Sequence, residues 1–73
     1  MKKNEFFKKL VDDLELENSN IDENFSVYLT SLNILSLIVL IDENFNKQLK
    51  ASEFSGIKTI KDIMQRIGME NFS

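Results

Sequence analysis

Residues 31–45, SLNILSLIVLIDENF, constrain the fold more than any other part of the chain. The apolar residues repeat at the spacing of an α-helix and fall on two adjacent faces. One stripe consists of Ile34, Leu37, Ile38, Ile41 and Phe45. The second consists of Leu32, Leu35 and Val39. A β-strand is a weaker interpretation, because the run is long, has no Gly or Pro break, and contains the polar segment DEN before its last Phe.

Two further amphipathic helices are predicted near the ends of the chain. The first runs from Asn4, a suitable N-cap, to Leu14. Its stripe consists of Phe7, Leu10, Val11 and Leu14. The last follows Thr59, which resembles the start of a capping box with Asp62, and stops at Gly68. Its stripe consists of Ile60, Ile63, Met64 and Ile67. Residues 69–73 are expected to fray.

The segments between the three helices complete the predicted fold. Residues 15–30 form a long loop with room for one short helical turn. Spaced apolar residues are expected to pin this loop across the bundle: Ile21, Phe25, Val27, Tyr28 and Leu29. Residues 51–55 are expected to form one short helix with Phe54 facing inward. The prediction is an all-α fold: a small four-helix bundle of three main helices and one short helix, in a single domain spanning residues 1–73.

Composition excludes several function classes. The chain has 73 residues, a net charge of −3, and neither Cys nor His. It therefore lacks thiolate and imidazole ligands for zinc and the usual general base of a hydrolytic triad. The negative charge argues against nucleic acid as a partner and favours a partner with a basic face. No apolar run is long enough to span a membrane, and no apolar signal region follows Lys2 and Lys3, so we expect a cytoplasmic protein.

Ser31 stands directly before the apolar run, and two roles are open for it. Its side chain could simply cap the helix, which is the commoner role for a Ser in this position. Alternatively Thr30 is the cap and the Ser31 hydroxyl is free in the first helical turn. A phosphate ester there would meet unpaired backbone N–H groups and the positive end of the helix dipole. No base is present to activate the hydroxyl for catalysis, so we expect no enzymatic activity.

The stretch TSLNILSLIVLIDENF resembles the signature helix of acyl carrier proteins, in which a Ser precedes a Leu and opens an apolar helix ending in acids and a Phe. The resemblance continues through NKQLKASEFSGIKTIKDIMQRIG and includes FKKLVDDL and IDENFSVYL upstream. It implies that Ser31 carries a 4'-phosphopantetheine arm, transferred from coenzyme A by a phosphopantetheinyl transferase. The arm would hold an acyl group as a thioester, so the reactive atom belongs to the cofactor.

The resemblance also implies a partner-binding surface. Its partners would be the transferase and acyl-loading and synthase enzymes with basic docking faces, and the carrier itself would be a monomer. The positions that match this surface are Leu32, Asn33, Leu35, Ser36, Val39, Asp42, Glu43, Glu53 and Ile57. Ordinary core packing is an equally good interpretation of the three apolar residues Leu32, Leu35 and Val39.

Several positions depart from the family pattern. Thr30 replaces the usual Asp before the Ser, Asn33 and Ser36 replace acids, and Tyr28 stands where a Gly is common. Loss of charge on a docking surface changes association rates and partner choice. These departures favour a specialised fatty-acid or polyketide-type carrier. The alternatives are an unmodified carrier-like interaction module, an aminoacyl or peptidyl carrier, and an unrelated small helical protein that binds through Leu32, Leu35 and Val39.

Overall fold

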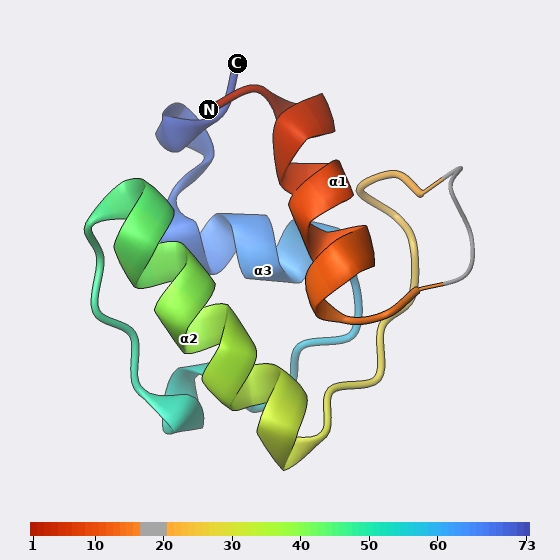
Figure 1. The fold of residues 1–73 in the computed structure, drawn as a ribbon, viewed down its shortest axis with the longest axis vertical. Helices are drawn as coiled ribbons and strands as arrows, with labels where there is room; N and C mark the ends of the chain where they lie inside the picture. The colour runs from red at the N-terminus through yellow and green to blue at the C-terminus, as the bar shows by residue number, and fades with distance from the viewer. Residues whose placement is uncertain (17–20) are drawn as a thin grey trace.

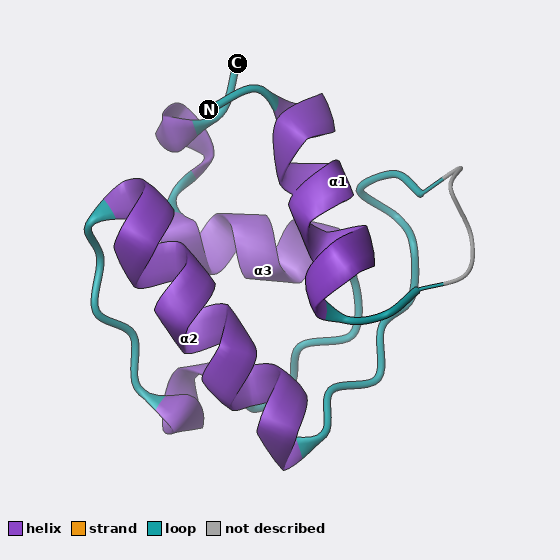
Figure 2. Ribbon diagram, viewed as in Figure 1, coloured by secondary structure: helices purple, strands orange, loops and turns teal. Residues whose placement is uncertain are grey.

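The protein consists of three α-helices connected by loops and two short 3-10 turns. The structure, a computed structural model, describes residues 1–16 and 21–73. The elements in chain order are α1 (Lys3–Asp13), α2 (Ser31–Phe45), η1 (Ala51–Phe54), α3 (Ile60–Ile67) and η2 (Met69–Asn71). In Figure 1, α3 crosses behind α1 and α2, and the two chain ends lie side by side. Figure 2 shows helices as the regular elements of the described residues, so the all-α prediction is confirmed.

The predicted fourth helix is smaller than expected. Residues 51–54 form only the 3-10 turn η1. The chain leaves the helical conformation after Phe54, because Ser55 is extended and Gly56 has a φ of +81°. Phe54 does face the core, with 4% of its surface exposed. No helix within the described ranges is long and apolar enough to cross a membrane.

The core is formed by the inward faces of all three α-helices and by η1. The buried side chains are Phe6, Leu10, Leu37, Ile41, Phe54, Ile60, Ile63, Met64 and Ile67. All four predicted residues of the α3 stripe are among them, because this short helix is covered by the rest of the molecule. The first stripe of α2 also faces inward: Leu37 and Ile41 are fully buried and its other members pack against the core. Burial of these side chains is the main source of stability for so small a domain.

The prediction for α1 is partly wrong. The helix begins at Lys3 rather than after Asn4, and its N-cap is Lys2, which makes no side-chain capping bond. Phe6 is fully buried, whereas Phe7 is only partly buried. The reason lies in the partners of the Phe6 ring, whose centroid lies 5.9 Å from that of Phe45 and 5.0 Å from that of Phe72. Apolar spacing alone does not distinguish between two adjacent Phe residues.

The prediction that residues 69–73 fray is also wrong. These residues form η2 and then place Phe72 against Phe6 and Phe45, with 5.2 Å between the centroids of Phe45 and Phe72. The Met1 ammonium group donates a hydrogen bond to the Asn71 carbonyl over 2.9 Å. Backbone hydrogen bonds also join the two ends of the chain, from Lys3 to Ser73 and from Ser73 to Met1. The C-terminal segment is therefore a structural part of the bundle.

Residues 21–30, the segment before α2, cross the bundle in a mostly extended conformation and are called the strap below. The predicted loop over residues 15–30 includes residues 17–20, which lie outside the described residues. From Phe25 to Thr30 inward and outward side chains alternate: Phe25, Val27 and Leu29 pack against the core, whereas Tyr28 is exposed. Tyr28 is thus not one of the predicted anchors, although Ile21, Phe25, Val27 and Leu29 are.

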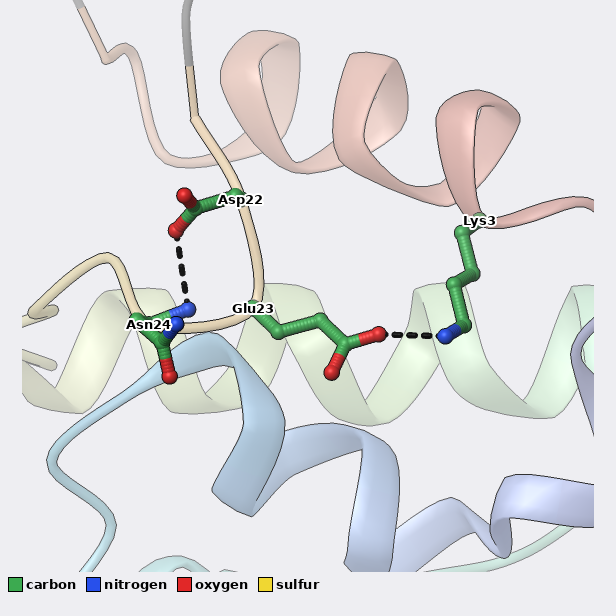
Figure 3. A network of polar contacts seen from close by, with 4 residues as sticks. All are labelled: Lys3, Asp22, Glu23 and Asn24. Atoms are coloured by element: carbon green, nitrogen blue, oxygen red, sulfur yellow. Dashed lines mark hydrogen bonds and ion pairs between the residues drawn. The ribbon is translucent and has the colours of Figure 1, made fainter.

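Polar contacts attach the strap to α1 and form one tight turn. Figure 3 shows the Lys3 ammonium group and the Glu23 carboxylate pointing toward one another as an ion pair. The hydrogen bond from Lys3 lowers the pKa of Glu23. The Asp22 carboxylate accepts the Asn24 N–H over 2.9 Å, and the Asp22 carbonyl accepts the Phe25 N–H over 3.1 Å. The described part of this loop therefore contains a hydrogen-bonded turn at residues 22–25 in place of the short helical turn that was expected.

Candidate functional site

Ser31 is the first residue of α2, and Thr30 is the cap. The Thr30 hydroxyl accepts the Asn33 N–H over 3.2 Å. The Asn33 side-chain carbonyl accepts the Thr30 N–H over 3.2 Å and the Thr30 hydroxyl over 3.0 Å. This is a capping box built by Thr30 and Asn33 alone. Of the two roles left open for Ser31, the structure therefore excludes the cap.

The Ser31 hydroxyl and the adjacent backbone donors are unoccupied. The residue is exposed, and its hydroxyl makes no hydrogen bond with residues 1–16 or 21–73. The N–H groups of Ser31 and Leu32 likewise find no acceptor within these ranges. The first turn of α2 contains no acidic residue. Free N–H groups and an uncompensated positive dipole end favour a bound anion here.

The first N–H groups of α3, unlike those of α2, have acceptors within the protein. The Ile60 N–H donates to the Phe25 carbonyl over 3.1 Å, and the Lys61 N–H donates to the Glu23 carbonyl over 2.8 Å. The strap therefore satisfies the first donors of α3, while those of α2 face solvent. The difference follows from the path of the chain, since both helices have a Thr cap.

The second apolar stripe of α2 is exposed. Leu32, Leu35 and Val39 have 76%, 58% and 54% of their surface accessible, respectively. The core-packing interpretation of these three residues is therefore wrong. They lie at i, i+3 and i+7, which places them on one side of the helix. Together with Ser31 they form a surface on which an exposed hydroxyl is followed by apolar side chains.

The remaining predicted partner-binding residues do not lie in one place. Asp42 and Glu43 are exposed at the far end of α2. Asn33 is engaged in the cap, and the Glu53 carboxylate accepts the Lys50 N–H over 2.8 Å at η1. Ile57 is half-buried and packs against the core. Ser36 is half-buried and, together with Val39 of the exposed stripe, lines an open groove between α1 and α2.

The groove between α1 and α2 contains an acidic side chain that sequence analysis did not single out. Asp13 lines it together with Lys9 and Glu43. One Asp13 carboxylate oxygen is buried without a hydrogen-bond partner among the described residues. Burial, and then the charge of Asp12, raise the pKa of Asp13. The repeated acids at positions 12 and 13 were visible in the sequence, but nothing there showed that one of them faces α2.

In the part of the chain that the structure describes, no group of three acidic, His or Cys side chains could hold a metal ion. The chain has no His or Cys that could activate the Ser31 hydroxyl. Comparisons with protein-family profiles, with curated proteins and with solved structures gave no match to this chain.

Proposed function

We propose that this protein is an acyl carrier protein, with a 4'-phosphopantetheine arm attached to Ser31 and a specialised fatty-acid or polyketide-type pathway as its setting. The observation that carries the proposal is the free, exposed hydroxyl of Ser31 at the first position of α2, next to a cap made by other residues. A hydroxyl used for capping would not be available for esterification. Here Thr30 and Asn33 cap the helix and leave Ser31 unused.

The attachment step makes a phosphodiester. The Ser31 oxygen attacks the phosphorus of coenzyme A that bears the pantetheine, and the bond from this phosphorus to the adenosine bisphosphate breaks. The serine proton passes to a base and the bisphosphate leaves. Because the chain has no His or Cys, the base and the magnesium ion belong to the transferase. This explains why a protein without catalytic side chains can take part in such chemistry.

The chain's own contribution is to hold the phosphodiester in place. The Ser31 and Leu32 N–H groups and the dipole of the 15-residue helix α2 stabilise its negative charge. No charged residue occurs from position 24 to position 41, so the chain on either side of Ser31 brings no carboxylate against this charge. The thiol at the free end of the arm would carry the acyl group into partner enzymes.

The exposed face of α2 supports recognition by those enzymes. Leu32, Leu35 and Val39 offer an apolar contact surface beside the attachment point. Exposed apolar residues gathered on one helix face are typical of protein interaction sites. Asp42 and Glu43, at the other end of α2, are available to a basic side chain of a partner. The helical fold, with η1 in place of the short third helix, is compatible with a carrier-type bundle.

The test is direct modification. Purified protein is incubated with coenzyme A, magnesium and a broad-specificity phosphopantetheinyl transferase, and its intact mass is measured. We expect the gain of one phosphopantetheine group, which is absent in Ser31→Ala. The matched control is Ser52→Ala, which removes another exposed serine hydroxyl and should leave the gain unchanged.

Two outcomes would contradict the proposal. One is the absence of any mass gain with several transferases, including one from the same host. The other is a gain that persists in Ser31→Ala. The first result would favour the second candidate, an unmodified helical module that binds a protein through its exposed α2 stripe. The second would show that the arm is attached to a residue other than Ser31.

A further inference from the structure

Tyr28 is the most exposed large apolar side chain of the described residues, with 88% of its surface accessible. It stands three residues before Ser31, so the two Cα atoms are at most about 11 Å apart. The attachment of an arm to Ser31 does not by itself require an aromatic residue at this place. An exposed Tyr so close to the reactive hydroxyl therefore calls for a separate explanation.

The exposure of Tyr28 is built into the fold. Its neighbours Val27 and Leu29 pack against the core, and alternation along the extended strap turns Tyr28 outward. The strap is fixed on α3 and the segment before it: the Val27 N–H donates to the Lys58 carbonyl over 2.8 Å, and Ser26 forms an antiparallel bridge with Thr59. Tyr28 is thus presented on a backbone that is already ordered. A side chain ordered in this way loses less conformational entropy when it binds.

The chain around Tyr28 carries no charge, and the charged residue that the strap contacts there is a cation, Lys58, whose carbonyl accepts the Val27 N–H. Leu32, Leu35 and Val39 are all more than half exposed. No charged residue occurs between Glu23 and Asp42. Asp42 lies eleven helical positions after Ser31, or about 16 Å along α2. That distance exceeds the screening length of about 8 Å at physiological ionic strength. Asp42 and Glu43 therefore contribute little to the attraction of a basic partner toward Ser31.

The size of the surface indicates what binds to it. Four partly exposed side chains offer on the order of a few hundred Å². A stable dimer interface needs about 800 Å² from each partner. The surface is therefore too small to hold a second copy of this chain, but it suits the short-lived docking of an enzyme that acts on Ser31.

We propose that Tyr28, together with Leu32, determines which enzyme modifies Ser31, and that the rim of this enzyme's active site has an apolar, aromatic-lined pocket in place of a cluster of basic side chains. The proposal rests on the proposed function. Tyr is one of the residue types that contribute most at interface centres, since it combines a large apolar ring with a hydroxyl that stays hydrated. The contact depends on burial of apolar surface, so its strength changes little with salt.

The experiment measures kcat and KM for modification of Ser31, with coenzyme A and magnesium, by whichever of several transferases modifies the wild-type protein fastest. Tyr28→Ala and Leu32→Ala are each expected to lower kcat/KM about tenfold, mainly through KM. Tyr28→Phe retains the ring and should stay within about twofold of wild type. Met69→Ala removes a partly exposed apolar side chain of η2 and is the matched control.

A second arm tests charge. The double variant Asp42→Asn, Glu43→Gln should change kcat/KM less than Tyr28→Ala does, at low and at high salt. An unchanged rate in Tyr28→Ala, or a larger loss in the charge variant, would overturn the inference while leaving the modification of Ser31 intact. A wild-type dimer in sedimentation that Tyr28→Ala dissolves would also overturn it. If the wild-type protein takes no arm from any transferase, the proposed function itself fails, which is a different result from insensitivity to Tyr28.

Discussion

Helices α2 and α3 both begin with a Thr cap, but their first residues differ in exposure to solvent. Thr30 caps α2 with Asn33, and Thr59 caps α3 with Asp62, each over a three-residue separation. The first residue after the cap is exposed in α2, where it is Ser31, and fully buried in α3, where it is Ile60. The capping box therefore sets where a helix begins but not whether its start is accessible.

The polar partners of the two helix starts differ in the same way. The Asp62 carboxylate accepts the N–H groups of Lys58 and Thr59 over 2.9 and 3.0 Å. The strap supplies carbonyl acceptors for the next two donors of α3. At α2, the neutral amide of Asn33 closes the cap and the following two donors face solvent. One helix start is thus saturated by the protein, and the other remains open to an external group.

The largest expected difference in stability is between truncation of Ile60 and truncation of Ser31, the first residues after the two caps. Ile60→Ala should destabilise the protein by about 2–5 kcal/mol, because it leaves a cavity in the core. Ser31→Ala should change the unfolding free energy by less than about 0.5 kcal/mol, since the hydroxyl has no structural partner. Urea unfolding followed by far-UV circular dichroism measures both. A comparable loss in the two variants would show that the start of α2 is also structural.

A smaller effect is expected from removing the caps. Thr30→Ala should cost about 1 kcal/mol, because it leaves the Asn33 N–H without an acceptor. Thr59→Ala should cost less, because the Asp62 N–H also donates to the Thr59 carbonyl over 3.1 Å. The same unfolding experiment applies, with Thr30→Ser and Thr59→Ser as controls that keep the hydroxyl. If Thr30→Ala had no effect, Ser31 would be able to replace Thr30 as the cap and its hydroxyl would not be free.

The smallest effect concerns the charge at the cap of α3. The backbone hydrogen bond from Lys58, followed by that from Thr59, lowers the pKa of Asp62 from its ordinary value of 3.8. The unfolded chain therefore takes up this proton more readily than the folded one, and the contribution of Asp62 to stability is full above pH 3.8. It is lost as the pH falls through the lowered folded value.

Unfolding of wild type and Asp62→Asn at neutral pH and below pH 3.8 measures this contribution. The difference between the two proteins should shrink in acid. The matched comparison is Asn33→Ala at the cap of α2, whose difference from wild type should not depend on pH. An equal pH dependence for Asp62→Asn and Asn33→Ala would mean that the charge of Asp62 does not stabilise the start of α3.

Local patterns in the sequence predicted the helices whose signals agree with one another. For α3, the Thr59 cap, the apolar stripe and the stop at Gly68 all indicated the same bounds, and the structure confirms them. For α2, the exposure of its second stripe was one of two equal possibilities. Periodicity shows that two apolar faces exist, but only the positions of neighbouring elements determine which of them is covered.

Long-range contacts account for the errors. The burial of Phe6 in place of Phe7 and the ordering of residues 69–73 both depend on one aromatic cluster, in which Phe6, Phe45 and Phe72 meet from three distant parts of the chain. No local pattern contains the information that these rings come together. The outward position of Tyr28 likewise follows from the contacts of Val27 and Leu29 with the core.

The sequence by itself determined that the chain is helical, where α3 begins, and that a Thr-Ser pair stands at the start of an apolar helix. These properties depend on residues a few positions apart, which interact in any fold that contains the helix. Only the tertiary structure decided that Ser31 is open while Ile60 is buried. That difference arises because the strap before α2 crosses over the start of α3 and satisfies its donors. Among the starts of the three α-helices in the described chain, only that of α2 combines unsatisfied donors with a free hydroxyl.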